Sequence, residues 1–174
     1  MIFPVEKAHE KGSVAILKGN IAPEGSVVKY AACAEDQREV VNATARVFNC
    51  EEDAYDAVVK KILNPGDVVI VRYEGPRGCG MPEMVATTEA ICCDDRINGS
   101  VALITDRGAA IGHVSPEAAA GGPIAFVEEG DLISYSVKNR TINLTGIHGV
   151  PCTVEEATAE LAKRAEKGII PREP

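Results

Sequence analysis

The side chains most capable of chemistry gather in a glycine- and proline-rich stretch, R-Y-E-G-P-R-G-C-G-M-P-E-M, at residues 72–84. It overlaps the end of an apolar run that reads as a buried strand, and in α/β proteins ligands bind beyond the carboxyl ends of strands. An arginine there could grip a carboxylate through two parallel hydrogen bonds. A surface loop whose glycines serve only its geometry explains the same residues, so both interpretations stay open. The candidate binding residues are Arg72, Glu74, Arg77, Gly78 and Cys79.

A second such stretch, residues 105–118, again follows an apolar run. Asp106 and Arg107 come at the end of that run, which makes them further candidates for binding a ligand. His113 could serve as an acid or base near neutral pH, although a single histidine before a helix more often caps or packs. We expect that helix to begin at residues 115–117, where the proline of Ser-Pro-Glu suits the first helical position.

Six cysteines occur in the chain, but they show no metal-binding pattern. None of them forms C-x-x-C, and no histidine lies at zinc-finger spacing. A disulfide framework is not expected either, because residues 1–7 lack a secretory signal. Cys79 follows Arg77 and precedes a possible helix start, an environment that would stabilise a thiolate. We expect reduced, mostly buried thiols, with the adjacent pair at a packed strand or helix end: Cys33, Cys50, Cys79, Cys92, Cys93 and Cys152.

The length of 174 residues fits one domain, which we divide into residues 1–150 and a C-terminal helix and tail at 151–174. Apolar residues make up 45% of the chain but aromatic residues only 4%, which predicts a core of aliphatic side chains. A net charge of −8 disfavours nucleic acid and anionic membranes as partners. Since no apolar run reaches the ~18 residues of a membrane span, we expect a cytoplasmic protein.

Hydrophobic spacing predicts two amphipathic helices. The first runs from about Glu51 to Leu63, with acidic residues in its first turn. Its buried face is expected to contain Ala54, Ala57, Val58 and Ile62. The second begins at Thr153, which forms a capping box with Glu156. Apolar runs at 67–73 and 101–105 are too short for helices and predict central strands covered on both faces.

Shorter β segments complete the domain. Three lie in the second half, at 124–127, 132–137 and 141–144, and their short connections suit an antiparallel meander. Two lie near the start, at 13–17 and 26–31, with a turn at 22–25 between them. The predicted fold class is therefore α/β, with one layer of helices against a mixed, curved sheet.

The motifs of this chain, taken in order, resemble the C-terminal domain of the dihydroxy-acid and phosphogluconate dehydratases. The resemblance runs from Ile2 to about Leu144, and more loosely to Pro174. M-P-E-M at 81–84 and G-H-V-S-P-E-A at 112–118 are its most specific parts. The other matching stretches are G-N-I-A-P-E-G at 19–25, R-Y-E-G-P at 72–76 and G-G-P-I-A at 121–125.

This resemblance implies a swivelling β/β/α fold with a barrel-like sheet, docked on a larger N-terminal domain. In the family, that larger domain supplies an iron–sulfur cluster and most ligands of a Mg²⁺ ion. The C-terminal domain contributes the glutamate of M-P-E-M as a metal ligand, and carboxylate oxygens suit Mg²⁺. By motif that ligand is Glu83. The C-terminal domain also contributes a serine, in G-R-F-S-G-G, as the proposed base.

The stretch with that serine is absent here, because the chain passes from Asp106 directly to Arg107-Gly108. The loop around Gly78-Cys79-Gly80 is also one residue shorter than the family pattern. We therefore expect no catalytic residue in this chain and no dehydration by the chain alone. In isolation it should hold no cofactor, with Mg²⁺ and an iron–sulfur cluster present only if a large subunit supplies the other ligands.

Three functions stay open. Met1 falls where the domain begins in longer relatives, so we expect a small subunit beside a separately encoded N-terminal domain, or a non-catalytic descendant. The second function is a module, monomeric or homo-oligomeric, that binds a hydroxy acid or keto acid through residues 72–83 and Arg107. The third is new chemistry using Cys79, Asp106 or His113.

Overall fold

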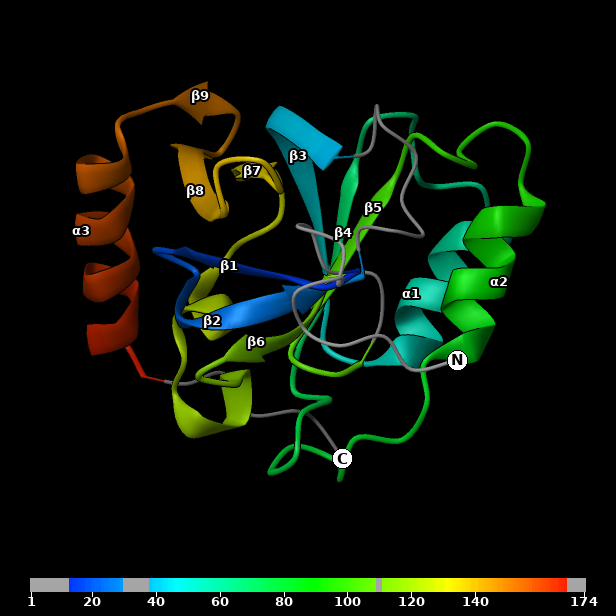
Figure 1. Cartoon of the computed structure of the whole chain (residues 1–174), viewed down its shortest axis with the longest axis horizontal. Helices are drawn as coiled ribbons and strands as arrows, with labels where there is room; N and C mark the ends of the chain where they lie inside the picture. The colour runs from blue at the N-terminus through cyan, green and yellow to red at the C-terminus, as the bar shows by residue number, and fades with distance from the viewer. Residues whose placement is uncertain (1–12, 30–37, 109–110, 169–174) are drawn as a thin grey trace, which may run out of the picture.

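A mixed β-sheet that closes on itself forms the centre of the molecule (Figure 1). The computed structural model describes residues 13–29, 38–108 and 111–168. In that part of the chain the strand order is β1-β2-β6-β5-β4-β3-β7-β8-β9, and a further pairing of β1 with β8 closes the first eight into a barrel. The strands are β1 (Ala15–Gly19), β2 (Ala22–Val28), β3 (Glu39–Phe48), β4 (Val68–Val71), β5 (Ala102–Thr105), β6 (Ile111–Ser115), β7 (Leu132–Ser136), β8 (Thr141–Ile147) and β9 (Val150–Pro151).

Within the described residues, three α-helices cover the barrel on two sides. The helices are α1 (Glu51–Val59), α2 (Val85–Cys93) and α3 (Val154–Glu166), and two short 3-10 helices are η4 (Ala118–Ala120) and η5 (Pro123–Phe126). Helices α1 and α2 lie side by side and connect the parallel strands β3, β4 and β5, while α3 lies on the opposite side of the barrel (Figure 1). The predicted α/β, barrel-like fold is confirmed.

Strand β4 is buried on both faces, as its continuous apolar run predicts. Val68 and Ile70 point into the barrel, where they join the larger core cluster. Val69 and Val71 point the other way, into a second cluster with side chains of α1 and α2. Because side chains alternate along a strand, β4 packs against both the barrel core and the helix layer, and the loop at residues 72–84 connects β4 to α2.

Helix α3 begins as predicted. The Thr153 hydroxyl accepts a hydrogen bond from the Glu156 main-chain nitrogen at 3.2 Å, and the Glu156 carboxylate accepts one from the Thr153 nitrogen at 2.9 Å. Near its end, the buried Arg164 donates to the Asp131 carboxylate at 2.5 Å and to the Phe126 carbonyl at 3.0 Å. This ion pair ties α3 to the segment before β7.

The strand predicted at residues 124–127 is wrong, because this segment is the 3-10 helix η5. Its carbonyl groups do not pair with a neighbouring strand. The Arg72 guanidinium instead donates from Nη1 to the carbonyls of Ala125 and Val127, at 2.5 and 2.8 Å. Pro123, at the start of η5, has no N–H to give to a ladder.

The turn predicted at residues 22–25 lies inside β2, and the chain reverses earlier, at residues 20–21. The cause is a long-range contact: Asn20 exchanges hydrogen bonds with both main-chain groups of Leu144, at 2.7 and 3.0 Å.

The helix start predicted at residues 115–117 is also wrong. Ser115 instead pairs with Gly25 at the end of β6, and the short η4 begins after Glu117.

Helix α1 is shorter than predicted and ends at Val59, because Lys61 adopts a left-handed backbone conformation with φ of 56°. Ile62, predicted on the buried face, is consequently 47% exposed. The long strand β3 was not predicted, since its sequence E-V-V-N-A-T-A-R-V-F carries polar residues without a strict alternation.

Candidate functional site

The two chemically rich loops meet because β4 and β5 are parallel neighbours, so their carboxyl ends lie at the same edge of the sheet. Asp106, directly after β5, ties them together. Its buried carboxylate accepts hydrogen bonds from the main-chain nitrogens of Tyr73 and Glu74, both at 3.0 Å, and of Ala118 at 2.9 Å. Burial raises the pKa of Asp106 above its ordinary value, and the three N–H donors oppose that shift.

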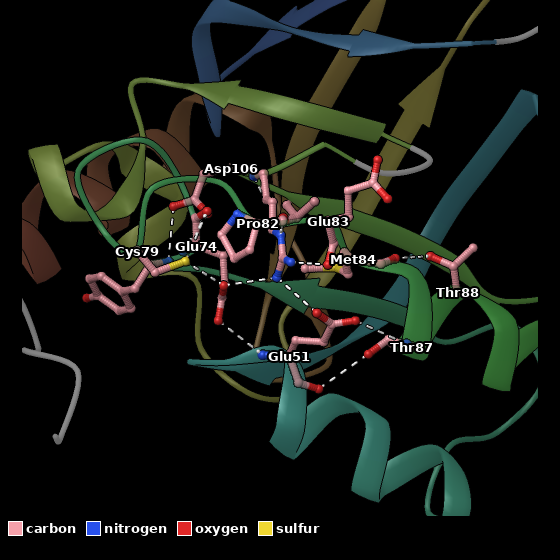
Figure 2. A network of polar contacts seen from close by, with 12 residues as sticks. Glu51, Glu74, Cys79, Pro82, Glu83, Met84, Thr87, Thr88 and Asp106 are labelled. Carbon is pink, nitrogen blue, oxygen red and sulfur yellow. Dashed lines mark hydrogen bonds and ion pairs between the residues drawn. The ribbon is translucent and has the colours of Figure 1, made fainter.

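Arg107 is the centre of a buried polar network in this loop region. Figure 2 labels its partners Glu51, Glu74, Pro82 and Glu83. The Nη1 atom of Arg107 lies 3.0 Å from a carboxylate oxygen of Glu51 and 3.0 Å from one of Glu74. Its Nε and Nη2 atoms donate to the main-chain carbonyls of Pro82 and Glu83. One side chain therefore connects the start of α1, the loop after β4 and the loop before α2.

Glu51 extends this network into the helix layer. Its carboxylate accepts a hydrogen bond from the Thr87 main-chain nitrogen at 3.3 Å, and its carbonyl accepts one from the Thr87 hydroxyl at 3.3 Å. The Glu51 nitrogen in turn donates to the carboxylate of Glu74 at 3.2 Å. The first turns of α1 and α2 are thus held to each other and to Arg107.

Cys79 faces the same network, and its environment suppresses its reactivity. The thiol donates to the Glu74 carboxylate, with Sγ 2.7 Å from Oε2. Burial, together with this hydrogen bond and the charge of Glu74, raises the pKa of Cys79 to about 11, although Arg107 acts in the opposite direction. The thiol is therefore protonated near neutral pH, which removes the support for a nucleophilic thiolate.

Glu83 lies differently from the other acids of the site. Its main-chain carbonyl is bound by Arg107, but its side chain is exposed. Figure 2 shows its carboxylate pointing away from Glu51, Glu74 and Cys79. The loop therefore presents a carboxylate at the surface to which no described side chain is paired.

The described residues fit only part of the metal chemistry that the family resemblance implies. Among them, no group of three or more His, Cys, Asp or Glu side chains is placed to hold a metal ion. An exposed carboxylate such as that of Glu83 suits one position on a Mg²⁺ ion, with the remaining ligands supplied from elsewhere. The described cysteines do not fit an iron–sulfur cluster, which takes several thiolates at one place.

A cleft of about 420 Å³ opens beside the network, between the loop after β4 and strand β6. Arg77 and His113 contribute exposed polar side chains to it, and Met81 contributes an apolar one. His113 lies within β6 with φ of 53°, and its main-chain nitrogen donates to the Arg107 carbonyl at 2.7 Å. Glu117, on the cleft wall, accepts from the Arg77 main-chain nitrogen at 2.8 Å.

Comparison with known proteins decides the family. The model of the family described as dihydroxy-acid/6-phosphogluconate dehydratase C-terminal matches residues 1–170. The chain belongs to this family. A dihydroxy-acid dehydratase from Clostridium novyi is 47% identical over 169 residues, which is 92% of this chain and 28% of that protein. Dihydroxy-acid dehydratases from Agathobacter rectalis and Methanosarcina barkeri are 52% and 48% identical, each over 83% of this chain and 27% of their own length.

This dehydratase C-terminal domain thus spans little more than a quarter of the length of the curated relatives it matches. Within the residues that the structure describes, no helix is long and apolar enough to cross a membrane.

The predicted binding residues of the domain fall into four places. Glu74, Cys79, Asp106 and Arg107 come together around the buried network, and Arg77 and His113 line the cleft. Arg72 lies apart from both places. Its guanidinium donates hydrogen bonds to the Asn49 side chain at 2.7 Å and to two main-chain carbonyls, those of Ala125 and Val127. Gly78 serves the loop geometry, because a Cβ there would lie 2.0 Å from the Tyr73 carbonyl oxygen. That these residues bind a ligand stays a prediction.

Three site residues escaped the sequence analysis as site residues: Glu51, Thr87 and Glu117. Glu51 was interpreted only as a first-turn acid that favours the helix, and nothing local shows that its carboxylate turns inward to Arg107. The expectation of mostly buried thiols is wrong for the described cysteines, since Cys92 and Cys93 are exposed at the end of α2 and the others are half-buried. Cys33 lies outside the described residues.

Proposed function

We propose that this chain is the C-terminal module of a dehydratase of the hydro-lyase type, acting as a small subunit beside a separately encoded large subunit in the cytoplasm. The observation that carries the proposal is the geometry at Glu83. The main chain of this residue is bound by the buried Arg107, while its carboxylate is exposed and points away from the buried acids of the network. A carboxylate held in this way can complete the ligand set of a metal ion on a docked partner.

In such a pair, a bound Mg²⁺ ion would act as a Lewis acid that polarises an oxygen of the substrate. The part of this chain is to supply one oxygen ligand, from Glu83, and to keep that ligand in place. The chain lacks the family serine stretch after Asp106, so the group that removes the proton must come from the partner. A non-catalytic descendant would keep the Arg107 network for stability alone.

The test begins with a native pull-down of the tagged chain from its own cell extract, followed by mass spectrometry. A stoichiometric large subunit bearing cluster cysteines would then be co-expressed with this chain and assayed for dehydration of 2,3-dihydroxy acids and sugar acids. We expect activity from the pair and none from the chain alone.

The decisive variant is Glu83→Gln, which keeps the size of the side chain and removes its charge. It should lower the activity of the pair at least about 10-fold, since even residues that only orient metal ligands have effects of that size. Glu89→Gln, an exposed glutamate on the neighbouring α2, is the matched control and should leave activity unchanged. Equal activity of the wild type and Glu83→Gln, or purification of the chain without a large subunit, would refute the proposal.

The cleft beside β6 favours one alternative, a module that binds a hydroxy acid or keto acid. Arg77 places an exposed guanidinium at the cleft, whereas the buried Arg107 is engaged by two carboxylates and two carbonyls and has little left for a ligand. A ligand of the native state raises the melting temperature. We would measure it with lactate and pyruvate, expecting a rise that Arg77→Gln abolishes. No shift with either acid at millimolar concentration would exclude this alternative.

A further inference from the structure

The contact between Arg107 and the main chain of Glu83 points to a role beyond stability. We infer that Arg107 is the positioning residue of Glu83, which fixes the segment at residues 82–84 so that the exposed carboxylate is held in one place. That Glu83 needs such a fixed place rests on the proposed function. The fixing itself is a property of this chain and can be measured without a partner.

The shape of the Arg107 guanidinium suits it to this role. Its Nε and Nη2 atoms donate to two consecutive carbonyls, those of Pro82 and Glu83, while Nη1 faces two carboxylates. Only the planar fork of an arginine offers donors in these separate directions at once. A lysine ammonium could remain with the carboxylates, but it could not bind both carbonyls as well.

The carboxylates that bind the Arg107 guanidinium are themselves held in place. The Arg107 and Glu74 side chains are each only 3% exposed, and Glu51 is held to α2 by Thr87. Glu74 is itself fixed by hydrogen bonds from the Glu51 nitrogen and the Cys79 thiol. The guanidinium therefore has little freedom to swing, and a side chain fixed by a second layer of contacts is what precise positioning requires.

The start of α2 is held by contacts from other segments and not by a capping side chain of its own. The N-cap residue Met84 makes no side-chain capping hydrogen bond, and the first turn of this helix carries no acidic residue. Glu51 binds the first turn of α2 at Thr87, whereas the two carbonyl contacts from Arg107 lie directly before the helix. Arg107 therefore constrains the segment from which the Glu83 side chain projects.

The test compares Arg107→Lys with Arg164→Lys by hydrogen–deuterium exchange and mass spectrometry on the isolated chain. Arg164 is the matched control: its side chain is also 3% exposed, it also binds a buried carboxylate, and it lies on α3, on the other side of the barrel (Figure 1). At temperatures equally far below each melting point, we expect exchange in residues 81–88 to rise at least 10-fold in Arg107→Lys. Exchange there should be unchanged in Arg164→Lys.

An equal rise in both variants, or no rise in Arg107→Lys, would overturn the inference. Should Arg107→Lys fail to fold, the wild type still tests it by nitrogen-15 relaxation of the Glu83 and Met84 amides. Order parameters of about 0.85, typical of rigid backbone, are expected, and values below about 0.6 would refute the positioning role.

In the reconstituted pair, Arg107→Lys should raise the Mg²⁺ concentration needed for half-maximal activity about 10-fold, with a smaller effect on kcat at saturating Mg²⁺. Arg164→Lys should change neither. Faster exchange in residues 81–88 of Arg107→Lys, combined with full activity of Glu83→Gln, would support the positioning role and refute the proposed function. Unchanged exchange in Arg107→Lys, combined with an inactive Glu83→Gln pair, would refute the positioning role and support the proposed function.

Discussion

Replacing Asp106 by alanine should loosen the whole site, because this one carboxylate accepts three main-chain hydrogen bonds from two different segments. The substitution leaves the N–H groups of Tyr73, Glu74 and Ala118 in a buried place without their acceptor. Each such group costs about 1–3 kcal/mol. Removing the charge also removes its own desolvation cost, which favours the low end of the range. We therefore expect a loss of about 3 kcal/mol in the free energy of unfolding.

Urea denaturation of the wild type and of Asp106→Ala, followed by circular dichroism, measures this loss. Asp56→Ala is the control, since Asp56 is an exposed residue of α1 paired with Lys60, the residue that follows the end of the helix, and such i,i+4 pairs contribute about 0.3–0.5 kcal/mol. A loss below about 1 kcal/mol in Asp106→Ala would contradict the reasoning. It would mean that water or other groups satisfy the three nitrogens and that Asp106 does not hold the two loops together.

Three further predictions concern single positions. Cys79 should react with iodoacetamide far more slowly than the exposed Cys92 at pH 8, and its reaction should speed up only as the pH approaches about 11. Peptide mapping that finds equal labelling would contradict its half-buried, protonated state. Thr153→Ala should lower the free energy of unfolding by about 1 kcal/mol through loss of the α3 capping box, as urea denaturation can check. Gly78→Ala should lower the melting temperature by several degrees because its Cβ would overlap the Tyr73 carbonyl, and an unchanged value would show that the loop relaxes easily.

Elements determined by their own residues were predictable from the sequence. The apolar run of β4 and the capping box of α3 each contain their own signal, and both occur where the sequence places them. The segment at residues 123–126 shows the opposite case. Its apolar residues suit a strand, but the Arg72 guanidinium, some 50 residues earlier in the chain, binds the carbonyls that a strand would need.

The candidate site divides in the same way. Asp106, Arg107 and Glu83 could be identified as site residues from the sequence, because they follow buried strands or match a family motif. The partnership of Arg107 with Glu51 could not be found in this way, because it spans 56 residues and depends on how α1 packs. Cys79 was also misjudged, since a nearby arginine suggests a thiolate, whereas the nearest charge in the fold is the carboxylate of Glu74.

The pairing of β1 with β8, which closes the barrel, limits when this domain can complete its folding. Lys18 pairs with Thr141, and Asn20 exchanges hydrogen bonds with Leu144 across 124 residues of sequence. Gly19 allows this approach, because a Cβ at that position would lie 1.8 Å from the Ile142 carbonyl oxygen. During synthesis the edge of β1 that pairs with β8 therefore stays unpaired until β8, near the end of the domain, has left the ribosome. We expect slow folding and a need for chaperones during that interval, both set by the two strands farthest apart in the barrel sequence.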